Sequence, residues 1–252
     1  MRLIAAAVLA TALLIPSTAH ATSSPAQATS STAQAALTTA PPRKQAPSVN
    51  CAVVKCLALT FDDGPAKTTG PLLDILAKHR AKASFYLIGR SVARSPGLAR
   101  RIAREGHEIG NHTYSHPRLT ELPGEDIAHQ LDRTQRLIAK ATGRAPATMR
   151  PPYGATDDRV LSVAESLGLA QVMWTGTTED WRLREERAIR RAVLSMARRN
   201  GVILMHDPVP ATVEAMPSIL AALKKRGYHL VTVSALLRGR PLSPGETYPP
   251  RK

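Results

Sequence analysis

LTFDDGP, residues 59–65, joins an apolar run to a turn and places two aspartates between them. Neighbouring side chains on a strand point to opposite faces, so Asp62 and Asp63 can converge on one site only if the strand ends there. Gly64 and Pro65 predict that end, because glycine tolerates positive φ and proline offers no N–H. The two carboxylates are either a catalytic pair or a polar cap between strand and helix. On this stretch alone the cap is the better interpretation, since aspartate is common at N-caps.

Strand-like and helix-like segments alternate along the rest of the chain. The strand-like segments are residues 56–61, 83–88, 108–110, 148–150, 171–174, 202–205 and 230–233. Between them apolar residues recur with helical period, as at Ile127, Leu131 and Ile138 before a Gly143 C-cap, and Ser95-Pro96 and Thr156-Asp157 are typical helix starts. This alternation predicts an α/β fold with parallel strands, a distorted (β/α) barrel with about seven strands.

Ionisable residues gather where the predicted strands end. They are Asp62 and Asp63 after the first strand, His112 and His116 after the third, Arg150 at the end of the fourth, Asp180 with Trp181 after the fifth, and His206 at the end of the sixth. The carboxyl ends of barrel strands share one face, which is where such folds carry their chemistry. We therefore expect these side chains to lie together at the face of the barrel formed by the carboxyl ends of its strands.

The termini differ in composition from this core. A short apolar run ending in Ala19-His20-Ala21 predicts a signal peptide, residues 1–21, because the run is well short of the roughly 20 residues that a membrane span needs. Residues 22–50, rich in Ser, Thr, Ala and Pro, predict a disordered linker. Residues 51–238 suit one domain, and residues 239–252 a Pro-rich tail.

The formal net charge is +15, from 34 basic and 19 acidic residues. Nucleic acid is disfavoured as a partner, because we expect export and because nine aromatic residues offer little for base stacking. We expect a secreted monomer near an anionic cell wall or membrane surface, without a stable membrane span after signal cleavage. A basic surface that serves only solubility stays open, since net charge describes association and not fold.

The two cysteines, Cys51 and Cys56, both precede the first strand. An oxidising compartment makes a disulfide the expected state. Five extended steps would separate the two Cα atoms by roughly 16 Å, against about 4 to 7 Å in a disulfide, so residues 52–55 must turn back.

The segment HTYSH places His112 and His116 four residues apart, a spacing that brings two imidazoles to one side of a helical turn. Pro117 disfavours helical geometry at His116, so such a turn would stop at once. Alone, the pair is weak evidence and a surface turn is the better interpretation. A carboxylate as third ligand would complete a catalytic zinc site, and the aspartate pair offers both a ligand and a base.

Five motifs occur in the order found in polysaccharide deacetylases. They are LTFDDGP, EIGNHTYSHPRL, RPPYG, the DW of EDW, and LMH. The chain resembles the NodB-homology domain of carbohydrate esterase family 4 over essentially residues 56–237. Five motifs in register are far more specific than any one of them.

The resemblance implies a role for each matching residue. It implies Asp63, His112 and His116 as metal ligands, Asp62 as the base that takes a proton from the attacking water, and Arg150 as its partner. His206 would be the acid that protonates the leaving amine, and Asp180 its tether. The backbone N–H of Tyr153 would stabilise the oxyanion, while Trp181 and Leu204 would line the pocket for the acetyl methyl. Thr177 and Thr175 depart from the family, which commonly has aspartates there, and this bears on local hydrogen bonds and substrate preference.

The resemblance thus implies a metal-dependent hydrolase of non-peptide amide bonds that removes N-acetyl groups from an N-acetylglucosamine-containing polysaccharide. Peptidoglycan is the preferred substrate, with chitin or chito-oligosaccharide close behind. Zinc is the expected metal, and Co²⁺, Ni²⁺, Mn²⁺ or Fe²⁺ suit the same ligands. Two alternatives stay open, an O-acetyl esterase acting on xylan and a non-catalytic glycan-binding module.

Overall fold

The computed structural model describes residues 49–237 and 240–250. The predicted signal peptide and nearly all of the predicted linker lie outside the described residues. Within them, parallel strands form one sheet in the order β6-β7-β1-β2-β3-β4-β5-β9, and β8 pairs with the first half of β1. The strands are β1 Lys55–Asp62, β2 Ser84–Leu87, β3 Glu108–Asn111, β4 Thr148–Met149, β5 Ala170–Val172, β6 Gly176–Thr177, β7 Gly201–His206, β8 Tyr228–Val231 and β9 Thr247–Tyr248. The predicted α/β fold is confirmed.

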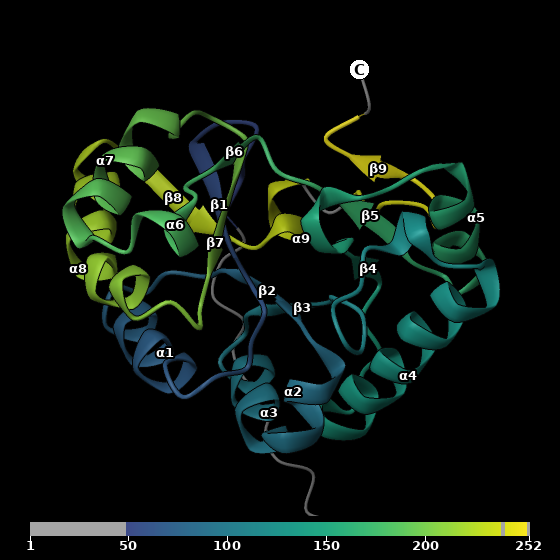
Figure 1. Ribbon diagram of the computed structural model, residues 1–252. Helices are drawn as coiled ribbons and strands as arrows, with labels where there is room; N and C mark the ends of the chain where they lie inside the picture. The colour runs from purple at the N-terminus through teal and green to yellow at the C-terminus, as the bar shows by residue number, and fades with distance from the viewer. Residues whose placement is uncertain (1–48, 238–239, 251–252) are drawn as a thin grey trace, which may run out of the picture. The chain divides into compact units, whose positions relative to one another are not determined.

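Helices connect the strands and lie around the outside of the sheet (Figure 1). They are α1 Thr69–Lys78, α2 Gly89–Arg94, α3 Pro96–Arg104, α4 Gly124–Thr142, α5 Asp158–Ser166, α6 Asp180–Leu183, α7 Glu186–Met196, α8 Pro210–Lys225 and α9 Val233–Leu236, with 3₁₀ turns η1 Leu119–Glu121 and η2 Pro152–Gly154. All residues of β1 after Lys55 are buried, as expected for a parallel strand covered on both faces. None of the described helices is long and apolar enough to span a membrane.

Each predicted strand overlaps one that the structure contains, and two further strands of two residues each were not predicted. One of these, β9, lies in the predicted Pro-rich tail and pairs in parallel with β5, beside which it is drawn in yellow (Figure 1). The N–H groups of Gln171 and Met173 donate to the carbonyls of Glu246 and Tyr248 at 2.8 and 2.7 Å. Part of the tail therefore completes an edge of the sheet.

Two helix boundaries follow the local chemistry that the sequence indicates. Gly143 adopts φ 81° after α4, the left-handed conformation of a glycine C-cap, and its N–H donates to Ala139. Asp157 precedes α5 and its carboxylate accepts from the Val160 N–H at 2.8 Å. Both predicted boundaries are confirmed.

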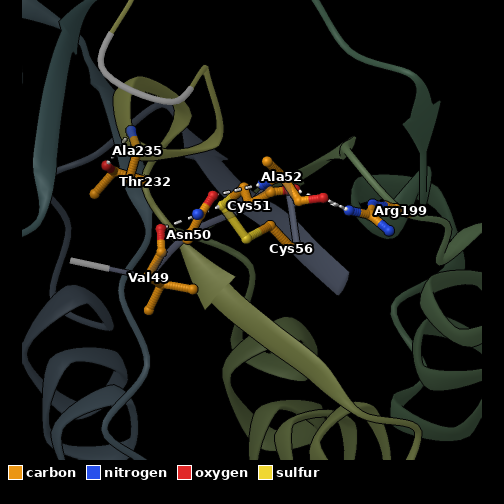
Figure 2. The surroundings of a disulfide bond; sticks show 8 residues. All are labelled: Val49, Asn50, Cys51, Ala52, Cys56, Arg199, Thr232 and Ala235. Atoms are coloured by element: carbon orange, nitrogen blue, oxygen red, sulfur yellow. Dashed lines mark hydrogen bonds between the residues drawn. A yellow bond between two sulfur atoms is a disulfide. The ribbon is translucent and has the colours of Figure 1, made fainter. Parts of the chain in front are cut away.

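Cys51 and Cys56 form the expected disulfide, with their Cα atoms 5.4 Å apart. The chain turns back between them because the N–H groups of Val53 and Val54 both donate to the Asn50 carbonyl. Figure 2 shows Arg199, from the loop before β7, reaching the carbonyls of Cys51 and Ala52. The disulfide loop is thereby tied to the start of a neighbouring strand, at the end of the sheet away from the predicted site.

Candidate metal centre and active site

The ends of β1 and β7 meet at a cavity of about 500 Å³. Asp62 and His206 are register partners on these two strands. Eight of the ten predicted site residues line the cavity, namely Asp62, Asp63, His112, His116, Tyr153, Trp181, Leu204 and His206. The other two, Arg150 and Asp180, are fully buried behind it. The structure thus brings all ten predicted residues together.

The two histidines are held by a loop and not by a helical turn. Residues 112–118 form a loop in which Thr113 and His116 have φ of 64° and 68°. The side chain of Gln130, on α4, accepts from the N–H groups of Tyr114 and Ser115, both at 2.9 Å. Backbone donors that a helix would satisfy internally are therefore satisfied by a side chain from a neighbouring helix.

Asp63, His112 and His116 present three potential ligand atoms to one point. Oδ1 of Asp63 lies 3.5 Å from Nε2 of His112 and 3.3 Å from Nε2 of His116, and all three atoms lie within 4.8 Å of one another. Oδ1 is buried, and no described residue donates a hydrogen bond to it. An orphaned carboxylate oxygen facing two imidazole nitrogens is the arrangement that a cation would satisfy.

The protonation states of these groups also suit a metal. Nδ1 of His112 lies 2.7 Å from the carbonyl of Arg150, which can only accept, so Nδ1 donates and Nε2 is the ring nitrogen left to face a metal. Burial and the neighbouring His112 lower the pKa of His116, which favours its neutral form. Burial opposes ionisation of Asp63, yet its contact with His112 and the nearby imidazoles lower its pKa to about 2. Ligands must be deprotonated to bind a metal, and the lowered pKa values of Asp63 and His116 favour that state.

Asp62 is held by a buried arginine. Nη1 of Arg150 donates to Oδ1 of Asp62 at 2.8 Å and to Oγ1 of Thr60 at the same distance. The remaining guanidinium donors reach the carbonyls of Val172 and Met173, each at 2.9 Å. The guanidinium is thus satisfied by hydrogen bonds and by one carboxylate, as a fully buried charge must be. The second oxygen of Asp62 is left on the cavity side, 3.8 Å from His112 Nε2.

His206 is held by Asp180 at the start of α6. Nδ1 of His206 donates to Oδ1 of Asp180 at 2.7 Å, and the His206 N–H donates to Oδ2 at 2.8 Å. Oγ1 of Thr212 also donates to Oδ2, at 2.6 Å. Burial lowers the pKa of His206, but the hydrogen bond and charge of Asp180, together with the charges of Asp62 and Asp63, raise it to about 9. The imidazole therefore stays protonated at neutral pH.

The cavity wall includes residues that the sequence reasoning missed. They are Pro151, Trp174, Glu179, Pro208 and Val209. Thr177 lines the cavity too, whereas Thr175 pairs with β7 through hydrogen bonds to the N–H and carbonyl of Val202. Tyr153 and Trp181 remain exposed, by 62% and 55%, although both line the cavity. Large exposed aromatic faces beside a cavity suit a sugar substrate better than a closed core.

Comparisons with known proteins identify the family of this chain. The family model described as polysaccharide deacetylase matches residues 50–172. A peptidoglycan N-acetylglucosamine deacetylase of Bacillus cereus is 37% identical over 190 residues, which cover 73% of this chain and 89% of that protein. The chain belongs to the polysaccharide deacetylase family. The chitooligosaccharide deacetylase of Rhizobium leguminosarum is 37% identical over 187 residues, covering 68% of this chain and 87% of the relative.

Other members of the polysaccharide deacetylase family are longer. The peptidoglycan N-acetylglucosamine deacetylase of Listeria monocytogenes is 40% identical over 195 residues, which cover 77% of this chain but only 41% of the relative. The chain thus spans about two fifths of that protein. The solved structure of a Bacillus subtilis peptidoglycan deacetylase superposes with a TM-score of 0.72 at 37% identity, covering 75% of this chain and 93% of that one.

Proposed function

We propose that this chain is a metal-dependent deacetylase that removes N-acetyl groups from N-acetylglucosamine residues of a polysaccharide. One observation carries the proposal. The Asp63, His112 and His116 cluster lines the same cavity as Asp62 and His206. The Asp62 carboxylate is held by the buried Arg150, and the His206 imidazole is held by the buried Asp180. A glycan-binding module has no need of a base and an acid beside a ligand cluster.

Asp63, His112 and His116 would hold the metal, and zinc suits two imidazoles and one carboxylate. When bound, the cation supplies a Lewis acid that favours ionisation of water and stabilises negative charge on oxygen. Burial of His112 and the hydrogen bond from its Nδ1 to the Arg150 carbonyl keep its Nε2 aimed at that position.

The remaining residues divide the proton transfers between them. Asp62 accepts a proton from the attacking water, since Arg150 orients one of its oxygens and leaves the other free. His206, protonated beside Asp180, donates a proton to the amide nitrogen as the C–N bond breaks, so that acetate and a free amine leave. The backbone N–H of Tyr153 is the proposed donor to the oxyanion, and Trp181 and Leu204 the proposed walls around the acetyl methyl.

Peptidoglycan is the substrate that we favour. The net charge of +15 favours an anionic polymer, and two of the relatives above are named for peptidoglycan. Chito-oligosaccharide is the second candidate, because the Rhizobium relative is named for it. Secretion to the cell wall and a monomeric state belong to the same proposal.

The test measures acetate release from peptidoglycan, chito-oligosaccharide and acetylxylan in parallel, before and after chelation and after zinc is restored. We expect release from the first two, abolished by the chelator and recovered with zinc. Asp62→Asn should keep its metal but lose activity by about 10²- to 10⁴-fold, the usual contribution of a general base. Release from acetylxylan alone would indicate the esterase, and tight glycan binding without any acetate would indicate the binding module. Unchanged turnover by Asp62→Asn would remove the base assignment.

A further inference from the structure

A second cavity, of about 610 Å³, adjoins the candidate active site. The two cavities share Asp63, His116 and Pro208 in their walls. The second one extends from there along the loop after β1 and along α2. Its charged lining residues, besides Asp63, are Lys67, Arg90 and Arg94, which we call the basic arm.

The cations of the basic arm have no acidic partners. All three side chains are exposed, and among the described residues no carboxylate lies within ion-pair distance of any of them. Arg94 makes one hydrogen bond, at 3.3 Å, to the Ser91 hydroxyl. The only acid in the cavity wall is Asp63, which belongs to the ligand cluster. Three unpaired cations around one cavity create a potential that attracts an anion.

The backbone ties these cations to the ligand cluster. The Arg90 N–H donates to the carbonyl of Tyr114, between the two histidines, at 3.0 Å. The Ile88 N–H donates to the Gly64 carbonyl at 2.9 Å, next to Asp63. Thr68, the neighbour of Lys67, donates through its hydroxyl to the Asp207 carbonyl at 2.5 Å. The backbone positions that carry these cations are therefore fixed next to the ligand cluster, so an anion in the basic arm would lie beside the position of the reacting amide.

We propose that the basic arm binds a carboxylate carried by the sugar next to the one that loses its acetyl group. The proposal rests on the proposed function and narrows its substrate class to glycans that alternate neutral and acidic residues. In peptidoglycan the neighbouring sugar bears a lactyl ether whose carboxyl is either free or extended by a peptide with carboxylates of its own. Chitin offers only neutral neighbours. Arginine and lysine around an open cavity match a carboxylate through charge-assisted hydrogen bonds.

The test compares three tetrasaccharides as substrates. They are neutral chitotetraose, the alternating N-acetylglucosamine and N-acetylmuramic acid tetrasaccharide with free lactyl carboxylates, and the same tetrasaccharide carrying peptides. The variant Lys67→Ala/Arg90→Ala/Arg94→Ala is compared with the control Lys140→Ala/Lys224→Ala/Lys225→Ala. The control removes the same charge from exposed lysines in the last turns of α4 and α8, and these turns lie at the opposite end of the strands.

We expect the basic-arm variant to raise KM for an acidic tetrasaccharide roughly tenfold, with kcat and the chitotetraose kinetics within about twofold of wild type, since exposed ion pairs each contribute modestly. Raising salt from about 0.05 M to about 0.5 M should reproduce the effect in the wild type and the control. A raised KM of the basic-arm variant for the peptide-free glycan would identify the lactyl carboxylate as the bound group. A raised KM only for the peptide-bearing glycan would identify a carboxylate of the peptide.

The proposal would be overturned if the basic-arm variant raised KM equally for neutral and acidic tetrasaccharides. It would also be overturned if the control variant raised KM for the acidic tetrasaccharides as much as the basic-arm variant. If wild-type protein releases no acetate from any of the three, the proposed function fails. Calorimetric titration of zinc-loaded wild type and basic-arm variant with the acidic tetrasaccharides then tests the basic arm by itself. Equal affinities in that titration would overturn it.

Discussion

Replacing Asp180 with asparagine should change the pH dependence of catalysis. The substitution keeps His206 but lowers the pKa of its imidazole. The Asp180 carboxylate is fully buried and accepts two hydrogen bonds from His206, one from Nδ1 and one from the backbone N–H. It holds the pKa of His206 at about 9, above the ordinary 6.5, although burial acts in the opposite direction. That difference corresponds to about 3 kcal/mol in favour of the protonated ring, close to the roughly 4 kcal/mol between unit charges about 4 Å apart near a protein surface.

The neutral amide of Asp180→Asn keeps the shape of the side chain but loses this charge. Burial continues to lower the pKa of His206 while the charges of Asp62 and Asp63 still raise it, so we expect that pKa to return to about its ordinary value of 6.5. At pH 8 the protonated fraction then drops from about nine tenths to about 3%, a loss of about 30-fold, whereas at pH 6 the loss is less than about twofold. The alkaline limb of kcat/KM, which reports ionisation of the free enzyme, should move toward acid by about 2.5 pH units.

The assay is acetate release from chito-oligosaccharide between about pH 5.5 and pH 9.5 with zinc-saturated protein. Thr212→Val is the matched control, because it removes one hydrogen bond of 2.6 Å from the same carboxylate and leaves the charge, so its limb should move by less than about one pH unit. A rate for Asp180→Asn that falls by one factor at every pH would refute the reasoning. Asp180 would then support the fold without setting the charge of His206.

Two further changes test the ligand cluster and the buried arginine. His116→Ala removes one of three ligands, so metal affinity measured by competition with a chelator should fall at least tenfold, and full retention of metal after dialysis against that chelator would contradict the assignment. Arg150→Met leaves the Asp62 carboxylate buried without its partner and should lower the free energy of unfolding in urea by about 3 to 5 kcal/mol. Adding Asp62→Asn to that variant should restore part of the loss, and strictly additive losses would show that the two side chains are not coupled.

Periodicity in the sequence predicted the fold well because parallel strands are buried on both faces. The two longest strands, β1 and β7, are mostly apolar and buried, and the helices between the strands have an apolar face. β6 and β9, of two residues each, have no period that could reveal them. β9 is followed directly by Pro249, and an edge strand tolerates proline where an N–H would face away from the sheet.

The motifs located the predicted residues but not the contacts that position them. The histidine loop is held by Gln130, the Arg150 side chain by Thr60, and the Asp180 carboxylate by Thr212. Each of these three is an ordinary polar residue in a helix or strand, and no motif singles it out as a contact. Such contacts join positions far apart in the chain, so no local pattern reveals them. The four-residue spacing in HTYSH likewise does not correspond to a helical turn. A four-residue spacing describes a helix only where the backbone bonds to itself, and here Gln130 supplies the acceptor.

The neighbouring aspartates show how one backbone angle directs two adjacent carboxylates to different partners. Asp62 is the last residue of β1 and reaches Arg150 across the barrel, as the alternation of a strand allows. Asp63 has φ 75°, which breaks that alternation and turns its carboxylate to the histidines on the same side. An L-residue in this region carries a conformational cost of about 1 kcal/mol, smallest for Asp and Asn. The buried, unpaired Oδ1 adds the cost of an unmade hydrogen bond, about 1 to 3 kcal/mol. A cation bound to Oδ1 would offset the second cost, which supports the proposed role of Asp63 as a metal ligand.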